Sequence, residues 1–138
     1  KIVICIHPRD SLSEKKKIFN DFDVFQNVTR ENIVKSYLVI FFDSSAIIDA
    51  VLMKKRIVTL TSNDLDENML IASNIYRDQL GIKQINIENY KELKKEQFIK
   101  ELNYNIKNYD NYIENNISPD GNEIGYKKIF KRIKEDLF

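Results

Sequence analysis

The stretch Tyr37-Leu-Val-Ile-Phe-Phe-Asp-Ser-Ser-Ala-Ile-Ile-Asp-Ala-Val-Leu52 decides the fold prediction. As far as Phe42 it is a continuous apolar run rich in β-branched and aromatic residues, which predicts a strand buried on both faces. The run breaks at Asp43-Ser44-Ser45, residues that favour helix N-caps, and apolar side chains then recur at helical spacing. A strand that turns directly into a helix through hydroxyl residues directs free backbone N–H groups at one point, which attracts anions. We therefore expect an anion site at Asp43, Ser44 and Ser45.

Strand-like and helix-like segments alternate on both sides of this stretch. Apolar runs predict strands at 2–6, 23–26, 38–42, 56–60 and 84–87, and helical spacing predicts helices at 12–19, 30–35, 45–53 and 66–80. Repeated strand–helix units with apolar strands predict an α/β fold, a Rossmann-like parallel sheet of about five strands with helices on both faces. This core is expected to occupy residues 1–90.

The character of the sequence changes after residue 90. Residues 91–138 are helical in period, and the last helix, at 125–138, carries an apolar stripe that must be buried, formed by Ile129, Phe130, Ile133 and Leu137. The chain also lacks an initiator Met and begins directly in a strand, so we expect it to be the C-terminal part of a longer protein. The helical tail is then predicted to pack on the core, on a missing N-terminal domain or on a second copy of the chain.

Composition narrows the class of protein. The 138 residues include 22 Lys and Arg against 21 Asp and Glu, and a formal net charge of +1 predicts no general attraction to nucleic acid. A single cysteine, Cys5, excludes an internal disulfide and fits a reducing compartment. No apolar stretch reaches the length of a membrane span, so we expect a cytoplasmic protein. Lysine clusters keep peripheral attachment to an inner membrane open as an alternative.

The first predicted strand ends in Ile6-His7-Pro8-Arg9-Asp10. In an open parallel sheet, ligands bind beyond the carboxyl ends of the strands, which is where His7 and Arg9 are expected. Pro8 fixes the turn, and the planar fork of Arg9 suits a phosphate or a carboxylate. The alternative is structural: His7 ends a strand, and Arg9 pairs with Asp10 on the surface.

Four further polar residues are expected at the same edge of the sheet. Ser44 and Ser45 either bind an anion or act only as N-caps, and Asp49 either reaches sugar hydroxyls or is a solvated helix acid. Thr61 ends the next strand, so His7, Ser44 and Thr61 are predicted to lie together. The sequence contains no glycine-rich phosphate loop and no paired Cys or His ligands, so we expect no metal and no cofactor.

The pair of motifs His7-Pro8-Arg9-Asp10 and Ser44-Ser45 resembles bacterial sialyltransferases of the lipooligosaccharide and polysialic-acid type. Related capsule and teichoic-acid polymerases have a similar pairing. The resemblance implies the C-terminal half of a GT-B fold, in which these motifs hold the nucleotide of a CMP-activated sugar. His7, Ser44 and Ser45 are then donor-binding residues. His7 is also the candidate catalytic residue, either giving a proton to the leaving phosphate or donating a hydrogen bond to it, whereas the family's general acid/base motif lies in the N-terminal half.

A second, looser similarity covers Asp49 to Val58. It resembles the Glu-Ala-x-x-x-Gly-x-Pro-Val segment of many GT-B glycosyltransferases, in which the acid binds the ribose. Asp49 stands here in place of Glu, Lys54 in place of Gly and Arg56 in place of Pro. The similarity implies a ribose-binding role for Asp49.

The resemblance therefore predicts the donor-binding domain of a glycosyltransferase that makes lipooligosaccharide or capsule. Its expected partners are a nucleotide-sugar donor, with CMP-sialic acid favoured, a glycan acceptor, and a missing N-terminal domain or a second copy of the chain. A CDP-glycerol or UDP-sugar transferase, or a UDP-sugar epimerase, is the alternative with the same fold. A non-catalytic α/β interaction module is the alternative from a different class.

Overall fold

The computed structural model describes residues 1–42, 44–89, 102 and 105–117. Within these residues five strands are formed: β1 (Val3–Ile6), β2 (Asp23–Gln26), β3 (Leu38–Phe41), β4 (Arg56–Thr61) and β5 (Lys83–Asn86). The helices are α1 (Leu12–Ile18), α2 (Thr29–Lys35), α3 (Ile47–Leu52), α4 (Glu67–Leu80) and α6 (Ile106–Tyr112), followed by a π-helical turn at Ile113–Ile117. The predicted α/β class is confirmed.

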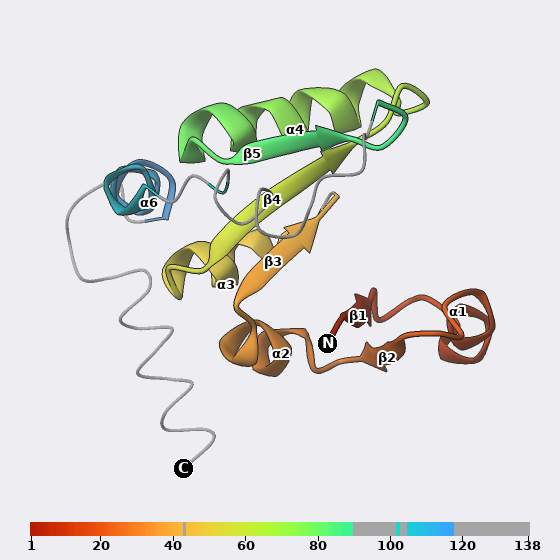
Figure 1. Ribbon diagram of the computed structural model, residues 1–138. Helices are drawn as coiled ribbons and strands as arrows, with labels where there is room; N and C mark the ends of the chain where they lie inside the picture. The colour runs from red at the N-terminus through yellow and green to blue at the C-terminus, as the bar shows by residue number, and fades with distance from the viewer. Residues whose placement is uncertain (43, 90–101, 103–104, 118–138) are drawn as a thin grey trace, which may run out of the picture.

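All the strand pairs are parallel, as predicted, but the strands form two sheets instead of one. β1 pairs with β2, and β3, β4 and β5 form a second sheet in that order. Figure 1 shows β1, β2 and α1 as a unit beside α2, apart from the three-stranded sheet. In this structure the strands expected in one five-stranded sheet are therefore divided between two sheets. The physical reason lies in α2, because contacts of this helix, and not a strand ladder between β1 and β3, connect the two sheets.

Two side-chain contacts of α2 make that connection. Asn32 Nδ2 donates to the Cys5 Sγ of β1 at 3.4 Å. Arg30 donates from Nε and Nη2 to Oδ1 of Asp49, on α3, at 3.1 and 2.6 Å. Ile33 of the same helix is buried in the core beside α3 and β4. One face of α2 therefore contacts the β1–β2 unit and another contacts the three-stranded sheet.

Among the described helices, α3 and α4 cover the same face of the three-stranded sheet. Phe41 and Thr59 are register partners on that face, with Phe41 stacked edge-on against Tyr76 of α4 and Thr59 Oγ1 hydrogen-bonded to Ser73 Oγ of α4 at 3.0 Å. Phe41 also belongs to the core cluster that contains the buried face of α3. Strands that follow one another in sequential order, joined by right-handed crossovers, place their helices on one side. The described helices of this sheet therefore lie on one face, and the helices predicted for the opposite face are not among the described residues.

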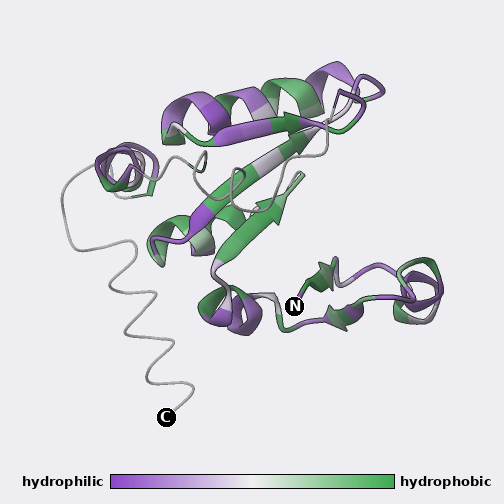
Figure 2. Ribbon diagram, in the orientation of Figure 1, coloured by the Kyte–Doolittle hydropathy of each residue, from purple (hydrophilic) through white to green (hydrophobic). Residues whose placement is uncertain are grey.

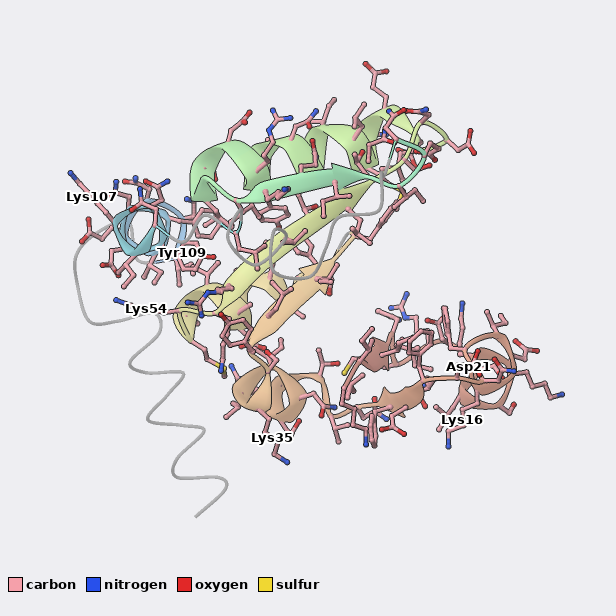
Figure 3. All side chains as sticks on the ribbon, viewed as in Figure 1. Lys16, Asp21, Lys35, Lys54, Lys107 and Tyr109 are labelled. Atoms are coloured by element: carbon pink, nitrogen blue, oxygen red, sulfur yellow. The ribbon has the colours of Figure 1, made fainter. Side chains whose placement is uncertain are left out.

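The core of the three-stranded sheet extends to α6. Tyr109 is fully buried, and its hydroxyl donates to the backbone carbonyl of Lys55 at 2.9 Å. Asp110 pairs with Lys54 at 2.9 Å, and Figure 3 shows Lys54 beside the helix that carries Tyr109. Figure 2 shows the hydrophobic character of β3 and much of β4, in contrast to the mostly hydrophilic α1. The apolar stripe predicted at 125–138 lies outside the described residues, as does residue 90, where the core was expected to end.

The end of α4 follows its sequence signal. Gly81 takes a left-handed backbone conformation with φ of 61°, and its N–H donates to the carbonyl of Arg77, as expected of a helix C-terminus. None of the helices described here combines the length and the apolar character needed to cross a bilayer.

Candidate functional site

The loop after β1 is a tight polar turn formed by His7, Pro8, Arg9 and Asp10. The N–H of Asp10 donates to the carbonyl of His7 at 3.0 Å. The N–H of Arg9 donates to Nδ1 of His7 at 3.1 Å. The side chains of His7 and Arg9 are exposed, so both face the solvent at the carboxyl end of a parallel strand. The sequence prediction for the position of this loop relative to its own strand is confirmed.

The hydrogen bond to Nδ1 sets the chemistry of His7. Because Nδ1 accepts from the backbone, the proton of a neutral imidazole resides on Nε2. The Nε2–H of this exposed side chain is therefore available as a hydrogen-bond donor. This form suits contact with an acceptor such as a phosphate oxygen.

Arg9 does not form the surface pair with Asp10 that was the structural alternative. Within the described residues, its guanidinium has no ion pair and no side-chain hydrogen bond, whereas Arg30 and Arg77 are both paired with carboxylates. An exposed, unpaired guanidinium next to an exposed imidazole N–H gives this loop a positive and donor-rich surface.

Gln26 holds the loop from the neighbouring strand. Its Nε2 donates to the carbonyl oxygens of Asp10, Pro8 and His7, at 2.8, 3.0 and 3.3 Å. Sequence reasoning did not single out Gln26. A sequence clue was its position as the last residue of the short strand predicted at 23–26, the next strand along the chain after 2–6.

The Ser44–Ser45 turn differs from the expected free helix N-terminus. Ser44 Oγ accepts from the N–H of Ala46 at 3.2 Å, and the carbonyls of Ser44 and Ser45 accept from Ile47 and Ile48, each at 3.1 Å. The N–H groups of Ala46, Ile47 and Ile48 are thus used within the turn, and α3 begins at Ile47 without a side-chain cap. α3 has only six residues, so few peptide dipoles align toward its start.

The two serine hydroxyls are what this turn offers to a ligand. Both serines are exposed, and within the described residues the Ser45 hydroxyl has no partner, while Ser44 Oγ keeps its own proton to donate. The third residue expected in this site, Asp43, lies outside the described residues.

The carboxylate of Asp49 is paired with Arg30, so Asp49 is not a helix acid that contacts only solvent. Its Oδ1 accepts both the Nε and the Nη2 hydrogen bonds of Arg30, and the pair is partly buried between α2 and α3. The sequence reasoning missed Arg30 because the two residues are 19 positions apart. The ribose-binding role that the resemblance implies for Asp49 would have to share this carboxylate with Arg30.

The carboxyl ends of β4 and β5 carry a separate polar network. Glu88 accepts from the Ser62 hydroxyl and, at 3.1 Å, from the N–H of Asn63. The hydrogen bond from Ser62 is the main cause that lowers the pKa of Glu88 below its ordinary value. Thr61, expected beside His7 and Ser44, is instead buried, and its hydroxyl has no hydrogen-bond partner in the described part of the chain.

The structure thus assembles part of the expected site. It joins His7 through Asp10 into one loop, but no hydrogen bond or ion pair between described residues links that loop to Ser44 or Ser45, which follow a strand of the other sheet. Two open hollows of about 310 and 350 Å³ lie on the α1–β2 side, and both are lined by Phe22 and Asp23 and not by the expected site residues.

Comparisons with protein-family models, with curated proteins and with solved structures found no match to this chain. Within the described residues, no group of three or more His, Cys, Asp or Glu side chains is placed to hold a metal ion.

Proposed function

We propose that this chain binds the donor substrate of a glycosyltransferase, a nucleotide-activated sugar, and that CMP-sialic acid is the favoured donor. The observation that supports this most is the His7–Asp10 loop directly after a parallel strand, which presents an imidazole Nε2–H and a guanidinium that has no ion pair with any described residue. Two exposed hydroxyls, on Ser44 and Ser45, follow another parallel strand. These groups are all hydrogen-bond donors, and a phosphate is an acceptor.

The chemistry of glycosyl transfer gives these donors a task. Negative charge develops on the departing phosphate as the bond to the sugar breaks, and donors held in place beforehand stabilise it without reorganisation. Arg9 can give two parallel hydrogen bonds to phosphate oxygens. With Nδ1 occupied by the N–H of Arg9, His7 acts as a hydrogen-bond donor from Nε2 rather than as an acid that loses its proton.

The proposal also includes a single doubly wound sheet around this site, although β1-β2 and β3-β4-β5 are separate sheets in the structure. β1 and β3 each have one edge that pairs with no described strand, and α2 carries the chain from the first sheet to the second. Joining those edges gives the order β2-β1-β3-β4-β5, in which the crossovers change direction between β1 and β3. Ligands of open α/β sheets bind at such a switch point. We propose a Rossmann-like sheet of this order, half of a GT-B fold, in the complete donor-bound enzyme, with His7 and Ser44 at its switch point.

The product is lipooligosaccharide or capsule glycan, made in the cytoplasm or at the inner face of a membrane. The glycan acceptor and the catalytic base are assigned to an N-terminal half or to a second copy of the chain. A net charge of +1 offers no support for nucleic acid as a partner.

Calorimetric titration of CMP, CDP and UDP tests the proposal, on this chain and on the same chain joined to any N-terminal half that its gene encodes. CMP should bind most tightly. Arg9→Ala should weaken binding about ten- to hundredfold, since a hydrogen bond to a charged group contributes about 1.5–3 kcal/mol. The matched control is Lys16→Ala, which removes an exposed cation from α1 and should leave affinity unchanged.

Each other outcome points to a named alternative. Preference for CDP or UDP would favour the CDP-glycerol or UDP-sugar enzymes. If Ser44→Ala combined with Ser45→Ala leaves affinity unchanged in a folded protein, the serines are structural. Absence of nucleotide binding in both forms of the protein would overturn the proposal and favour a non-catalytic α/β module.

A further inference from the structure

We infer that Gln26 is a positioning residue for His7: it fixes the imidazole by holding the peptide that donates to Nδ1. The inference about the loop stands on geometry alone. Only its consequence for ligand binding rests on the proposed function.

The position of Gln26 follows from the strand register. Gln26 is the register partner of Ile6, the last residue of β1, so it stands beside the point where the His7–Asp10 loop begins. A glutamine side chain is long enough to reach under this loop from the adjacent strand. Its amide then meets three backbone carbonyls of the loop.

The three contacts require an amide nitrogen at that place. Nε2 carries two protons, and it lies 2.8 Å from the oxygen of Asp10, 3.0 Å from that of Pro8 and 3.3 Å from that of His7. The opposite orientation would put the amide oxygen against three carbonyl oxygens, with no proton between them. Neither an aliphatic nor an acidic side chain supplies donors for these carbonyls.

The Pro8 contact transmits the effect to His7. In a trans peptide the C=O of one residue and the N–H of the next point in opposite directions in one plane. Gln26 holds the carbonyl of Pro8, so the N–H of Arg9 in the same peptide turns to the other side. There it meets Nδ1 of His7 at 3.1 Å. Gln26 thus keeps Nδ1 occupied and leaves the proton on the exposed Nε2.

His7 is the only histidine in the chain, so nitrogen NMR of the imidazole reports on this one ring. In the unmodified protein Nε2 should carry the proton, Nδ1 should have the shift of a hydrogen-bonded acceptor, and the Arg9 amide should exchange slowly with solvent. In Gln26→Ala the Arg9 amide should exchange at least tenfold faster, and the Nδ1 resonance should move. Gln26→Glu, which has the same shape but places oxygens against the three carbonyls, should have the larger effect at neutral pH.

Gln84→Ala is the matched control. It removes a glutamine amide that is also hydrogen-bonded, to Ser73 and Asn74, from a different strand. This variant should leave the His7 ring and the Arg9 amide unchanged. A general loss of stability would affect both variants, whereas loss of positioning affects only the Gln26 variants.

Two results would overturn the inference. One is a folded Gln26→Ala protein whose Arg9 amide exchange and His7 resonances match those of the unmodified protein. The other needs no variant: a proton on Nδ1 of His7 in the unmodified protein at neutral pH.

Titration with CMP separates this inference from the proposed function. If Gln26→Ala disturbs the His7 ring and the unmodified protein binds no nucleotide, the positioning role stands and the function proposal fails. If the unmodified protein binds CMP and Gln26→Ala binds it equally, with an unchanged ring, only the positioning role fails.

Discussion

The β1–β2 unit and the three-stranded sheet differ in how much apolar surface they bury. Ala50, Val51 and Val58 in and beside the larger sheet are wholly buried, and the core there includes residues of α2, α3, α4 and α6. In the β1–β2 unit, by contrast, Ile2 is 65% exposed and Phe25 is 41% exposed. The loop after β1 is held by hydrogen bonds within the loop and by those from the Gln26 side chain.

Because of this difference in burial, the three-stranded sheet should be the more stable region and the β1–β2 unit the more adaptable one. Apolar burial is the main source of folding stability, so the three-stranded sheet should open last. Binding loops are commonly supported by such a stable region and lie in regions of lower local stability. The donor-rich loop with His7 and Arg9 belongs to the less buried region, as the proposed role in binding requires.

The largest expected effect is a loss of folding stability in the region of the three-stranded sheet. Tyr109→Ala should lower the free energy of unfolding by about 3–5 kcal/mol, because it empties a fully buried aromatic site at the junction of α6 with the sheet. Tyr109→Phe keeps the ring and loses the hydrogen bond to the Lys55 carbonyl, so about 1 kcal/mol should be lost. Urea unfolding measures both.

The matched variant in the other region is Phe25→Ala. Since the residue Phe25 is already 41% exposed, removal of its ring should cost about 1 kcal/mol or less. Equal losses in Tyr109→Ala and Phe25→Ala would contradict the contrast between the two regions.

A smaller effect concerns the contact between α4 and α6. Gly81→Ala should cost about 1–2 kcal/mol, because the left-handed backbone disfavours a Cβ atom. A Cβ atom at this position would also collide with the side-chain amide of Asn108, which must move away from the carbonyl of Leu80. Unfolding with and without Asn108→Ala separates the two causes: relief by the second substitution measures the collision, and the remainder is backbone strain.

The sequence predicted the local elements of the fold well because each carries its own signal. Apolar β-branched runs marked all five described strands within one or two residues, and Gly81 marked the end of α4. The division into two sheets carried no such signal. It depends on how α2 lies against β1 and α3, through contacts such as Arg30 to Asp49.

The candidate site was predictable in its residue types and not in its geometry. His7 and Arg9 were identified because a His-Pro-Arg sequence after a strand is distinctive. Gln26 and Arg30 were missed because a single glutamine or arginine acquires meaning only from its spatial partners, 16 to 19 positions away. The turn at Ser44 used its own backbone donors, which a pattern of cap-favouring residues does not reveal.

The smallest expected effect concerns the pH dependence of stability that arises from the exposed Glu88, which follows the last strand of the larger sheet. The Ser62 hydrogen bond lowers the pKa of Glu88 from its ordinary 4.5, so the folded protein favours the carboxylate more than the unfolded chain does. This contribution is fully present above pH 4.5 and is lost as the pH falls through the lowered folded-state pKa. Stability measured from pH 7 to pH 3 should therefore fall less steeply in Glu88→Gln than in the unmodified protein. Ser62→Ala should flatten the profile in the same way, since it removes the main donor to the carboxylate. Parallel profiles in all three proteins would show that the Ser62–Glu88 contact does not persist in solution.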